Sequence, residues 1–225
     1  RTGTEPKALD TDHNNLIKEN YAFFNRGVNL AAADTLDGTI TTFPSGATPD
    51  SDNTEVYYRN GDLTVDFSST ENVASNRKIV IFVNGDLTFS STPDTQMIDV
   101  SQGGFISFIS DSDITFDPTV GNSSETDTSP NIAGVFIADG TININGYSEA
   151  PLNDDTTKDN KFVGEGTFVG WTGFNLNRDY ENTTNPLQKE LNNTNPIEVF
   201  VFRPDFNLNI PNIMMRPSLV WQEVN

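Results

Sequence analysis

The chain has 225 residues, enough for one sizeable hydrophobic core, and its 13 basic and 32 acidic residues give a formal net charge of −19. Such an acidic excess repels nucleic acid and anionic membrane surfaces, so we expect neither as a partner. The absence of cysteine excludes a disulfide framework and a thiolate metal site. No apolar run reaches the ~20 residues of a membrane-spanning helix, so no span is expected within this chain.

The composition predicts β structure with many turns. Asn, Thr, Ser and Asp are abundant, strong helix formers are scarce, and Phe occurs 16 times. The first residues do not contain the apolar segment of a secretory signal peptide. We therefore interpret the chain as a processed piece of a larger, anchored precursor whose targeting signal lies elsewhere.

Residues 1–13 are polar and are expected to form a tether. Residues 14–27 have helical spacing, with Asn14 suited to cap the helix and Gly27 to end it. The apolar side chains that share one face of this helix are Leu16, Ile17, Tyr21 and Phe24. We expect the helix to cover the first end of the β structure that follows.

An incomplete calcium loop lies where the tether meets this helix. Asp10, Asp12 and Asn14 place oxygen atoms at the first, third and fifth positions of such a loop. The sixth position lacks the required Gly, and Tyr21 stands where the bidentate carboxylate belongs. His13 is the only histidine, so a multi-histidine metal site is excluded and the common nucleophilic triads lack their base. Apart from this Ca²⁺ candidate, no cofactor is expected.

One short phrase is written five times between Val56 and Leu176. It joins two apolar segments across a small polar turn, and its copies occupy residues 57–65, 81–89, 108–116, 136–144 and 168–176. Residues 37–40 resemble a degenerate sixth copy. Positions 62, 86, 113, 141 and 173 are equivalent, so successive copies are 24, 27, 28 and 32 residues apart. Repeats of this length are typical of solenoids and too short for propeller blades.

The aligned copies predict strands stacked in register. Three columns are apolar in every copy, and the column between the last two is polar throughout, which is the two-residue alternation of a β-strand. We expect the apolar columns to point inward, each side chain packing on its equivalents above and below. They contain Tyr58, Phe82, Ile109, Ile137 and Val169; then Leu63, Leu87, Ile114, Ile142 and Phe174; then Val65, Phe89, Phe116, Ile144 and Leu176.

The turn of the phrase carries small residues. Gly61, Gly85 and Gly140 occupy one position of it, which fits a tight corner with one residue near the left-handed α conformation. The same alternation that assigns Tyr58 to the core points Tyr57 and Trp171 outward or into a turn. Exposed aromatic residues suit either an assembly contact or a carbohydrate platform, so both are candidate surface contacts.

Asp62, Asp86 and Asp113 fall in one column and have two interpretations. Stacked outward carboxylates bind Ca²⁺ or act as acid and base in β-helical carbohydrate enzymes. Alternatively, each Asp caps its own corner through a hydrogen bond to its own backbone. The column ends at Thr141 and Gly173, and no Lys or Arg cluster accompanies it to bind an anionic sugar. The turn interpretation is therefore favoured.

The pattern stops after residue 176. A polar loop is followed by an apolar strand at 197–202 and a tail interrupted by Pro204, Pro211 and Pro217. Because an open solenoid end exposes its core and its strand edges, residues 178–225 are expected to cap the second end.

Residues 55–225 resemble a group of uncharacterised bacterial envelope proteins, some of them described as pilus-assembly or PilX-like. The matching segments are 57–64, 83–88, 162–169, 182–186, 198–205 and 221–224; the most specific of them reads Glu198-Val199-Phe200-Val201-Phe202-Arg203-Pro204-Asp205. The resemblance implies a secreted or surface-displayed β-solenoid that forms the C-terminal part of a longer, membrane-anchored or pilus-associated chain. It implies no catalytic residues.

These features predict one mostly-β domain over residues 14–225. It is expected to be a right-handed parallel β-helix of about five to six coils at 35–177, with the helical cap and the C-terminal cap described above. The expected function is that of a non-enzymatic structural or adhesive module on a bacterial cell surface or pilus. Its expected partners are copies of itself, other envelope proteins or glycans. The alternative is a carbohydrate-active β-helix, a polysaccharide lyase or hydrolase or a glycan-binding module, that uses the outward Asp residues. A third interpretation is a filament subunit whose solenoid stacks end to end with other copies.

Overall fold

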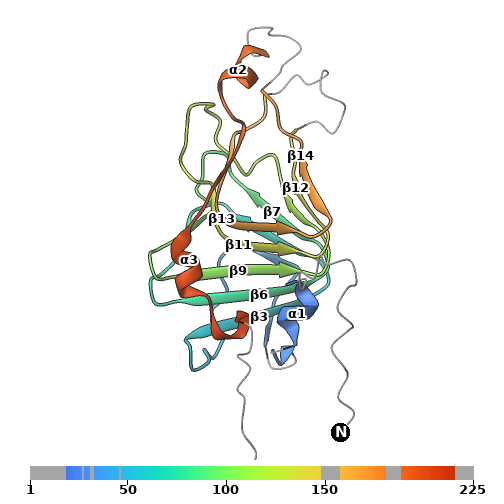
Figure 1. Cartoon of the computed structure of the whole chain (residues 1–225), viewed down its shortest axis with the longest axis vertical. Helices are drawn as coiled ribbons and strands as arrows, with labels where there is room; N and C mark the ends of the chain where they lie inside the picture. Colours follow the sequence, from blue (N-terminus) through green and yellow to red (C-terminus); the bar gives the residue numbers. More distant parts are fainter. Residues whose placement is uncertain are drawn as a thin grey trace, which may run out of the picture.

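In the computed structural model the chain builds two parallel β-sheets that curl into a half-barrel (Figure 1). The structure describes residues 19–26, 28–30, 33–45, 47–147, 158–180 and 189–215. The tether, His13 and the calcium candidates Asp10, Asp12 and Asn14 lie outside these residues.

Sheet A has nine strands and sheet B has six. Seven strands of sheet A are adjacent in the order β1 (Asp34–Thr35), β3 (Thr54–Asn60), β6 (Lys78–Asn84), β9 (Phe105–Ser110), β11 (Ile132–Ala138), β13 (Phe162–Gly170) and β15 (Glu198–Val201), and β5 (Glu71–Val73) and β8 (Ile98–Val100) pair beside them. Sheet B runs in the order β14 (Gly173–Leu176), β12 (Thr141–Ile144), β10 (Ile114–Phe116), β7 (Leu87–Ser91), β4 (Leu63–Phe67) and β2 (Thr39–Ile40).

The predicted register between the copies is confirmed. Each copy places its first half in sheet A and its second half in sheet B, beside the equivalent strands of the neighbouring copies. Ile81 pairs with Tyr57 and Phe108, and Leu87 pairs with Leu63 and Ile114. The degenerate copy at 37–40 takes its place as well, because β2 pairs in parallel with β4. The strands of sheets A and B therefore stack by repeat.

In sheet A the side chains that point inward are shifted by one position along the strand from the predicted ones. Phe136, not Ile137, faces sheet B, since its ring lies 5.4 Å from the rings of both Phe89 and Phe116. Tyr57, in the same column as Phe136, is 1% exposed, whereas Tyr58 is half-buried on the other face. Both faces of sheet A are covered, so its strands carry apolar side chains on both faces. The alternation of polar and apolar residues therefore cannot reveal which face is inward. In sheet B, which is covered on one face, the predicted inward columns are buried in β4, β7, β10 and β12, whereas Phe174 and Leu176 of β14 are exposed.

Phenylalanine rings fill the space between the two sheets. Phe136 stacks on Phe108 and Phe168 with ring centroids 5.7 and 4.8 Å away, and Phe89 stacks on Phe116 at 4.9 Å. Aromatic pairs of this kind stabilise a fold by about 0.5–1.5 kcal/mol each beyond the area that they bury. The stacking of like residues across repeats therefore supplies the core.

The N-terminal helix is shorter than the predicted 14–27 segment. Helix α1 spans Tyr21–Asn25, and its N-cap is Asn20, whose side chain accepts a hydrogen bond from the Phe23 N–H. Tyr and Phe are weak helix formers, so the turn depends on packing rather than on propensity. The Tyr21 ring supplies that packing, 5.8 Å from Phe82 on the outer face of sheet A.

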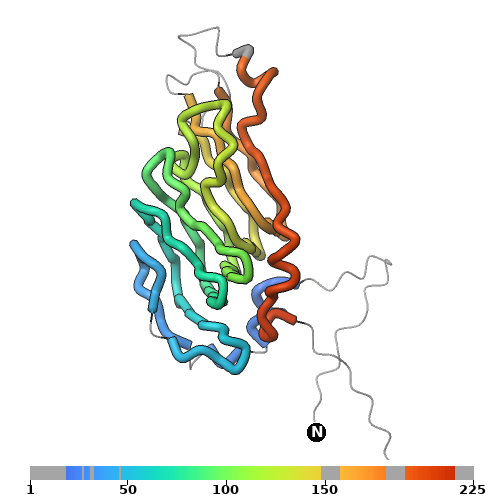
Figure 2. Tube along the Cα trace, turned by 90° about the vertical axis from the view of Figure 1, so that its left-hand side faces the viewer, coloured from blue at the N-terminus to red at the C-terminus, as the bar shows by residue number. Residues whose placement is uncertain are grey.

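The C-terminal segment covers the flank of the stack, not its end as predicted. After α2 (Lys189–Thr194), β15 adds an edge strand to sheet A. Helix α3 (Pro204–Asn209) and the 3₁₀ helix η2 (Asn212–Met214) then run down the outer face of sheet A to the neighbourhood of α1 (Figure 2). The apolar outer column of sheet A explains this path, because the tail buries apolar surface there.

Arg178, directly after sheet B ends, ties several loops together. Its guanidinium is 5% exposed and donates hydrogen bonds to four backbone carbonyls at 2.8–2.9 Å. The acceptors belong to Asp117, Val120, Asn145 and Asn160. Burial lowers the pKa of Arg178 to about 10, while Asp159 and Glu198 oppose this shift. These hydrogen bonds hold together the loops that interrupt the repeats.

We predict that Phe136→Ala lowers the free energy of unfolding by about 3–5 kcal/mol, because it opens a cavity in the centre of the ring stack. Leu208→Ala is the control, since Leu208 is 85% exposed and its truncation is expected to change stability by less than about 0.5 kcal/mol. Urea denaturation followed by circular dichroism measures both. Equal effects of the two substitutions would contradict the assignment of Phe136 to the core.

Candidate functional site

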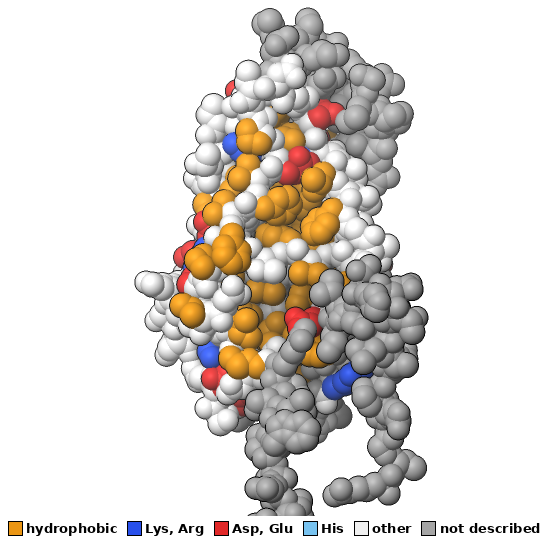
Figure 3. Space-filling view, viewed as in Figure 1, with side chains coloured by type: hydrophobic (Ala, Val, Ile, Leu, Met, Phe, Trp, Pro, Cys, Tyr) orange, Lys and Arg blue, Asp and Glu red, His pale blue; other side chains and the backbone are white. Residues whose placement is uncertain are grey.

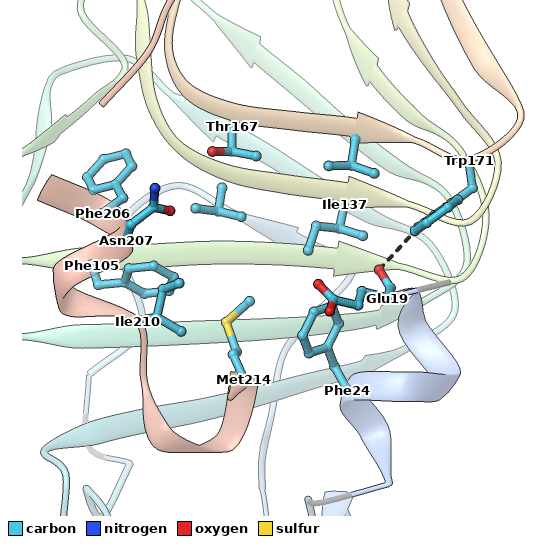
Figure 4. Close-up of a pocket in the computed structure, with 12 residues that line it drawn as sticks. Glu19, Phe24, Phe105, Ile137, Thr167, Trp171, Phe206, Asn207, Ile210 and Met214 are labelled. Carbon is cyan, nitrogen blue, oxygen red and sulfur yellow. Dashed lines mark hydrogen bonds between the residues drawn. The ribbon is translucent and has the colours of Figure 1, made fainter. Parts of the chain in front are cut away.

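A cavity of about 320 Å³ opens on the outer face of sheet A, between α1 on one side and α3 with η2 on the other (Figure 4). We call it the outer groove. It is lined by Glu19, Phe24, Phe105, Val135, Ile137, Thr167, Val169, Trp171, Phe206, Asn207, Ile210 and Met214.

The floor of the outer groove is made by three neighbouring strands. β9, β11 and β13 contribute side chains at alternate positions, and these therefore project from the same face. Val135 pairs with Thr167, and Ile137 pairs with Val169, in the register between β11 and β13. A floor held by two continuous hydrogen-bonded strands is rigid.

The α1 side of the groove is held by hydrogen bonds to the corners that follow β11 and β13. The Trp171 indole N–H donates to the Glu19 carbonyl at 3.1 Å. The Asp139 carboxylate accepts the Tyr21 N–H at 2.9 Å and the Asn20 side-chain amide at 3.1 Å. These bonds join residues more than 100 positions apart and fix the wall against the floor.

The opposite wall is fixed at both of its ends. Arg203, the residue before α3, donates to Glu165 of β13 at 2.9 Å and to Asp205 at 2.8 Å, and its guanidinium lies over the Phe206 ring. At the far end the Asn212 N–H donates to the Asp52 carboxylate at 2.8 Å. Phe206 is 1% exposed, so α3 packs firmly on the sheet.

The surface of this face carries a band of apolar side chains over sheet A (Figure 3). Among the residues that line the groove, Glu19 is the one charged side chain, and Thr167 and Asn207 are neutral and polar. An apolar cavity of this size with few polar groups is typical of sites that bind a small apolar ligand or an apolar part of a larger one. The lining offers hydrophobic contact, not acid–base chemistry.

The two candidate surface contacts, Tyr57 and Trp171, lie in different environments. Tyr57 is 1% exposed and its hydroxyl donates to Pro44 and Glu55, so the prediction of a surface contact there is wrong. Trp171 is half-buried and lines the outer groove. The two residues do not meet, because they belong to the first and last full copies of the phrase.

The Asp column forms a ladder between repeats. The Asp62 carboxylate accepts the Asp86 N–H at 2.9 Å, Asp86 accepts the Asp113 N–H at 3.3 Å and the Ser112 hydroxyl, and Asp113 accepts the Thr141 N–H at 2.7 Å. The structural interpretation of these residues is supported, with one correction. Each carboxylate bonds the backbone of the next repeat, not that of its own turn.

The small residue in each corner has two causes, the approach of the neighbouring repeat and the backbone conformation. A Cβ atom on Gly140 would lie 2.0 Å from the Asp113 Oδ1, and one on Gly85 would lie 2.7 Å from the Asp62 Oδ1. Gly61 and Gly85 have φ values of 107° and 157°, which side chains of L-residues rarely adopt, and a Cβ atom on Gly61 would meet nothing closer than 3.6 Å. Glycine is therefore needed for its backbone conformation at Gly61, because of the neighbouring repeat at Gly140, and for both reasons at Gly85.

The acidic loops are also engaged. Asp50 accepts the Asp52 and Thr54 N–H groups, Asp52 pairs with Lys78, and Asp159 accepts the Tyr147 and Asp179 N–H groups. In the described part of the chain, no three Asp, Glu or His side chains are grouped to hold a metal ion. Nor does any helix within the described ranges have the length and hydrophobicity to cross a bilayer.

Sequence reasoning did not find the outer groove. It treated Phe24 and Phe206 as parts of two covers at opposite ends, whereas both lie on one face. One signal was available: residues 79–83 are an uninterrupted apolar run and residues 105–109 are apolar except for Ser107, which indicates burial on both faces. That signal predicts a covered outer face, but not which segments cover it.

Comparison of the chain with protein family models, with curated proteins and with solved structures found no match. The proposed function is therefore based on the geometry of the outer groove.

We predict that Gly140→Ala lowers the free energy of unfolding by about 1–3 kcal/mol, because the new methyl group overlaps the Asp113 carboxylate. In an Asp113→Ala background the same substitution should cost less, and a double-mutant cycle by urea denaturation measures the difference. Gly38→Ala is the control, since its Cβ would meet only the flexible end of Arg59 at 3.2 Å. A Gly140→Ala effect that is unchanged without Asp113 would contradict the ladder.

Proposed function

We propose that the chain is a rigid, non-enzymatic structural and adhesive module, and that it engages its partner through the outer groove. In this proposal it is built as a right-handed parallel β-helix and is displayed on a bacterial cell surface or pilus as part of a longer, anchored precursor. The resemblance to envelope proteins and the acidic, Asn- and Thr-rich composition are its sequence support.

The alternation of the chain between two parallel sheets supports the β-helix. Each repeat contributes a strand to sheet A and then one to sheet B before the next repeat begins beside it, and two repeats add a further strand, β5 or β8, to sheet A. Parallel strands joined by crossovers are right-handed in almost all known cases, which is the basis for the proposed hand.

The observation that carries the adhesive function is the construction of the outer groove. Its floor is a rigid sheet, its walls are pinned by hydrogen bonds and ion pairs, and its lining is largely apolar. Pre-formed apolar cavities bind with little loss of conformational entropy in the protein. The acidic residues that were the alternative candidates for a site accept hydrogen bonds from backbone N–H groups.

The charge of the chain restricts the partner. At a net charge of −19, and with Glu19 as the one charged lining residue, an anionic ligand is repelled. We therefore expect the groove to take an aliphatic or aromatic group carried by a neutral or basic partner.

Trp171 provides a direct test, because Trp221 is the only other tryptophan and Trp221→Phe leaves Trp171 as the single indole reporter. We expect decyltrimethylammonium, below its micellar concentration, to shift Trp171 fluorescence at lower concentration than decanoate does.

Val169→Phe fills the groove and should weaken this binding at least tenfold. Thr88→Phe adds the same bulk to the outer face of sheet B and should leave it unchanged. Unaltered Trp171 emission with both probes would contradict the groove as a ligand site.

One observation favours the carbohydrate-active alternative. Burial raises the pKa of Asp111, and the nearby carboxylates of Asp139 and Asp86 raise it further. Glycosidases pair one carboxyl group of raised pKa, as the acid, with a second carboxylate. Asp139 and Asp86 are, however, already accepting backbone hydrogen bonds from α1 and from the next repeat.

Incubation with neutral polysaccharides, followed by a reducing-end assay, separates the two functions. Under our proposal neither the native chain nor Asp111→Asn releases reducing ends. The alternative requires release that is lost in Asp111→Asn but kept in Asp66→Asn, a control carboxylate on sheet B. It also requires activity to fall as pH rises through the pKa of Asp111, because a catalytic acid must hold its proton.

A further inference from the structure

The last repeat exposes side chains that every earlier repeat buries. Phe174 and Leu176 of β14 are 44% and 52% exposed. Their equivalents in the preceding four repeats are each 0 or 1% exposed: Leu63, Leu87, Ile114, Ile142, Val65, Phe89, Phe116 and Ile144. The inward columns of sheet B therefore continue onto an uncovered surface.

The last strand of sheet A is exposed in the same way. In β15, Phe200 is 42% and Val201 40% exposed, and the next residue, Phe202, is 62% exposed. The Phe200 ring still contacts Phe168 at 5.0 Å, so it belongs to the ring stack between the sheets. Large apolar side chains that cluster on a surface mark an interaction site.

Among the described residues, no strand pairs with the outer edge of the backbone at this end. β14 and β15 each stand last in the order of their sheet, and an edge strand presents free N–H and C=O groups to another strand. Asn175 ends a side-chain ladder as well. Its amide donates to Asn143 at 2.7 Å, and Asn143 donates to Thr115 at 3.4 Å. The surface thus offers a strand partner both apolar and amide contacts.

The opposite end of the stack does not provide a matching surface. Its strands β1 and β2 have two residues each, and Asp34 and Asp37 are exposed beside them. The apolar side chains there are covered, with Leu36, Ile40 and Phe43 only 8–9% exposed. Short strands with exposed charges are the usual protection of a sheet edge. A head-to-tail partner would therefore bury little apolar surface.

The exposed end carries little charge in a strongly acidic chain. β14 and residues 199–202 contain no charged side chain, and Glu198 is the one charged residue of β15, although the whole chain carries −19. Two copies that meet elsewhere bring like charges together, whereas two copies that meet here do not. The sequence of β14 is also self-complementary in an antiparallel pair, since Phe174 and Leu176 flank Asn175 symmetrically.

We propose that the last repeat binds the last repeat of a second copy across a two-fold axis. β14 pairs antiparallel with its counterpart, Asn175 faces Asn175 of the partner subunit, and Phe174 lies opposite Leu176 of the partner subunit. Helix α2 projects beyond this end (Figure 1). A two-fold contact of this kind is closed, so it yields a dimer and not a filament.

Sedimentation velocity of the full chain over a range of concentrations tests the proposal. We expect twice the monomer mass for the native chain. Leu176→Glu should return it to the monomer, because two carboxylates then meet near the axis. Leu208→Glu, on the exposed face of α3, should remain a dimer. A native chain that stays monomeric at all concentrations, or whose mass grows without limit, overturns the proposal. Groove binding followed by Trp171 fluorescence should persist in Leu176→Glu, so the two proposals fail separately.

A cysteine scan locates the axis, since the chain has no cysteine of its own. Directly opposed residues of antiparallel strands have Cα atoms about 4.5–5.5 Å apart, within the range that a disulfide spans. Asn175→Cys should therefore form a disulfide-linked dimer on mild oxidation. Thr64→Cys lies in the same polar column but inside the stack, and it should stay monomeric under reducing-agent-free denaturing electrophoresis. Equal cross-linking of the two variants overturns the two-fold contact at β14.

Discussion

The whole structure depends on the stacking of like side chains in register between repeats. Each inward side chain finds its equivalents on both sides, so one apolar column makes a continuous core, and the phenylalanine rings around Phe136 connect the two sheets. Because the repeats pack on one another, the interior repeats are covered on both sides, whereas the last repeat leaves Phe174 and Leu176 exposed. The properties of the ends and of the outer face follow from this one constraint.

The corners show the same constraint acting on polar groups. Neighbouring repeats approach so closely that a carboxylate such as Asp113 reaches the backbone of the next repeat, and glycine is required where it arrives. Acidic residues thereby become part of the scaffold. What remains for recognition is apolar surface, in the outer groove and on the last repeat, set in a chain whose net charge discourages anionic partners.

The outer groove exists because two segments from opposite ends of the chain meet on one sheet. Trp171 and Asp139 hold α1, and Arg203 and Asp52 hold the C-terminal segment. Both segments were predicted as covers, and both do cover apolar surface. They cover the flank, where sheet A presents an apolar column, while β14 and β15 keep an open edge.

The sequence by itself determined the repeats, their register, the inward columns of sheet B and the small corner residues. All of these follow from spacing and from contacts between equivalent positions. Only the tertiary structure decided which face of sheet A is inward, why Tyr57 is buried, and how Phe24 and Phe206 come to line one groove. Those features arise from contacts between segments with no common period, and local patterns carry no information about such contacts.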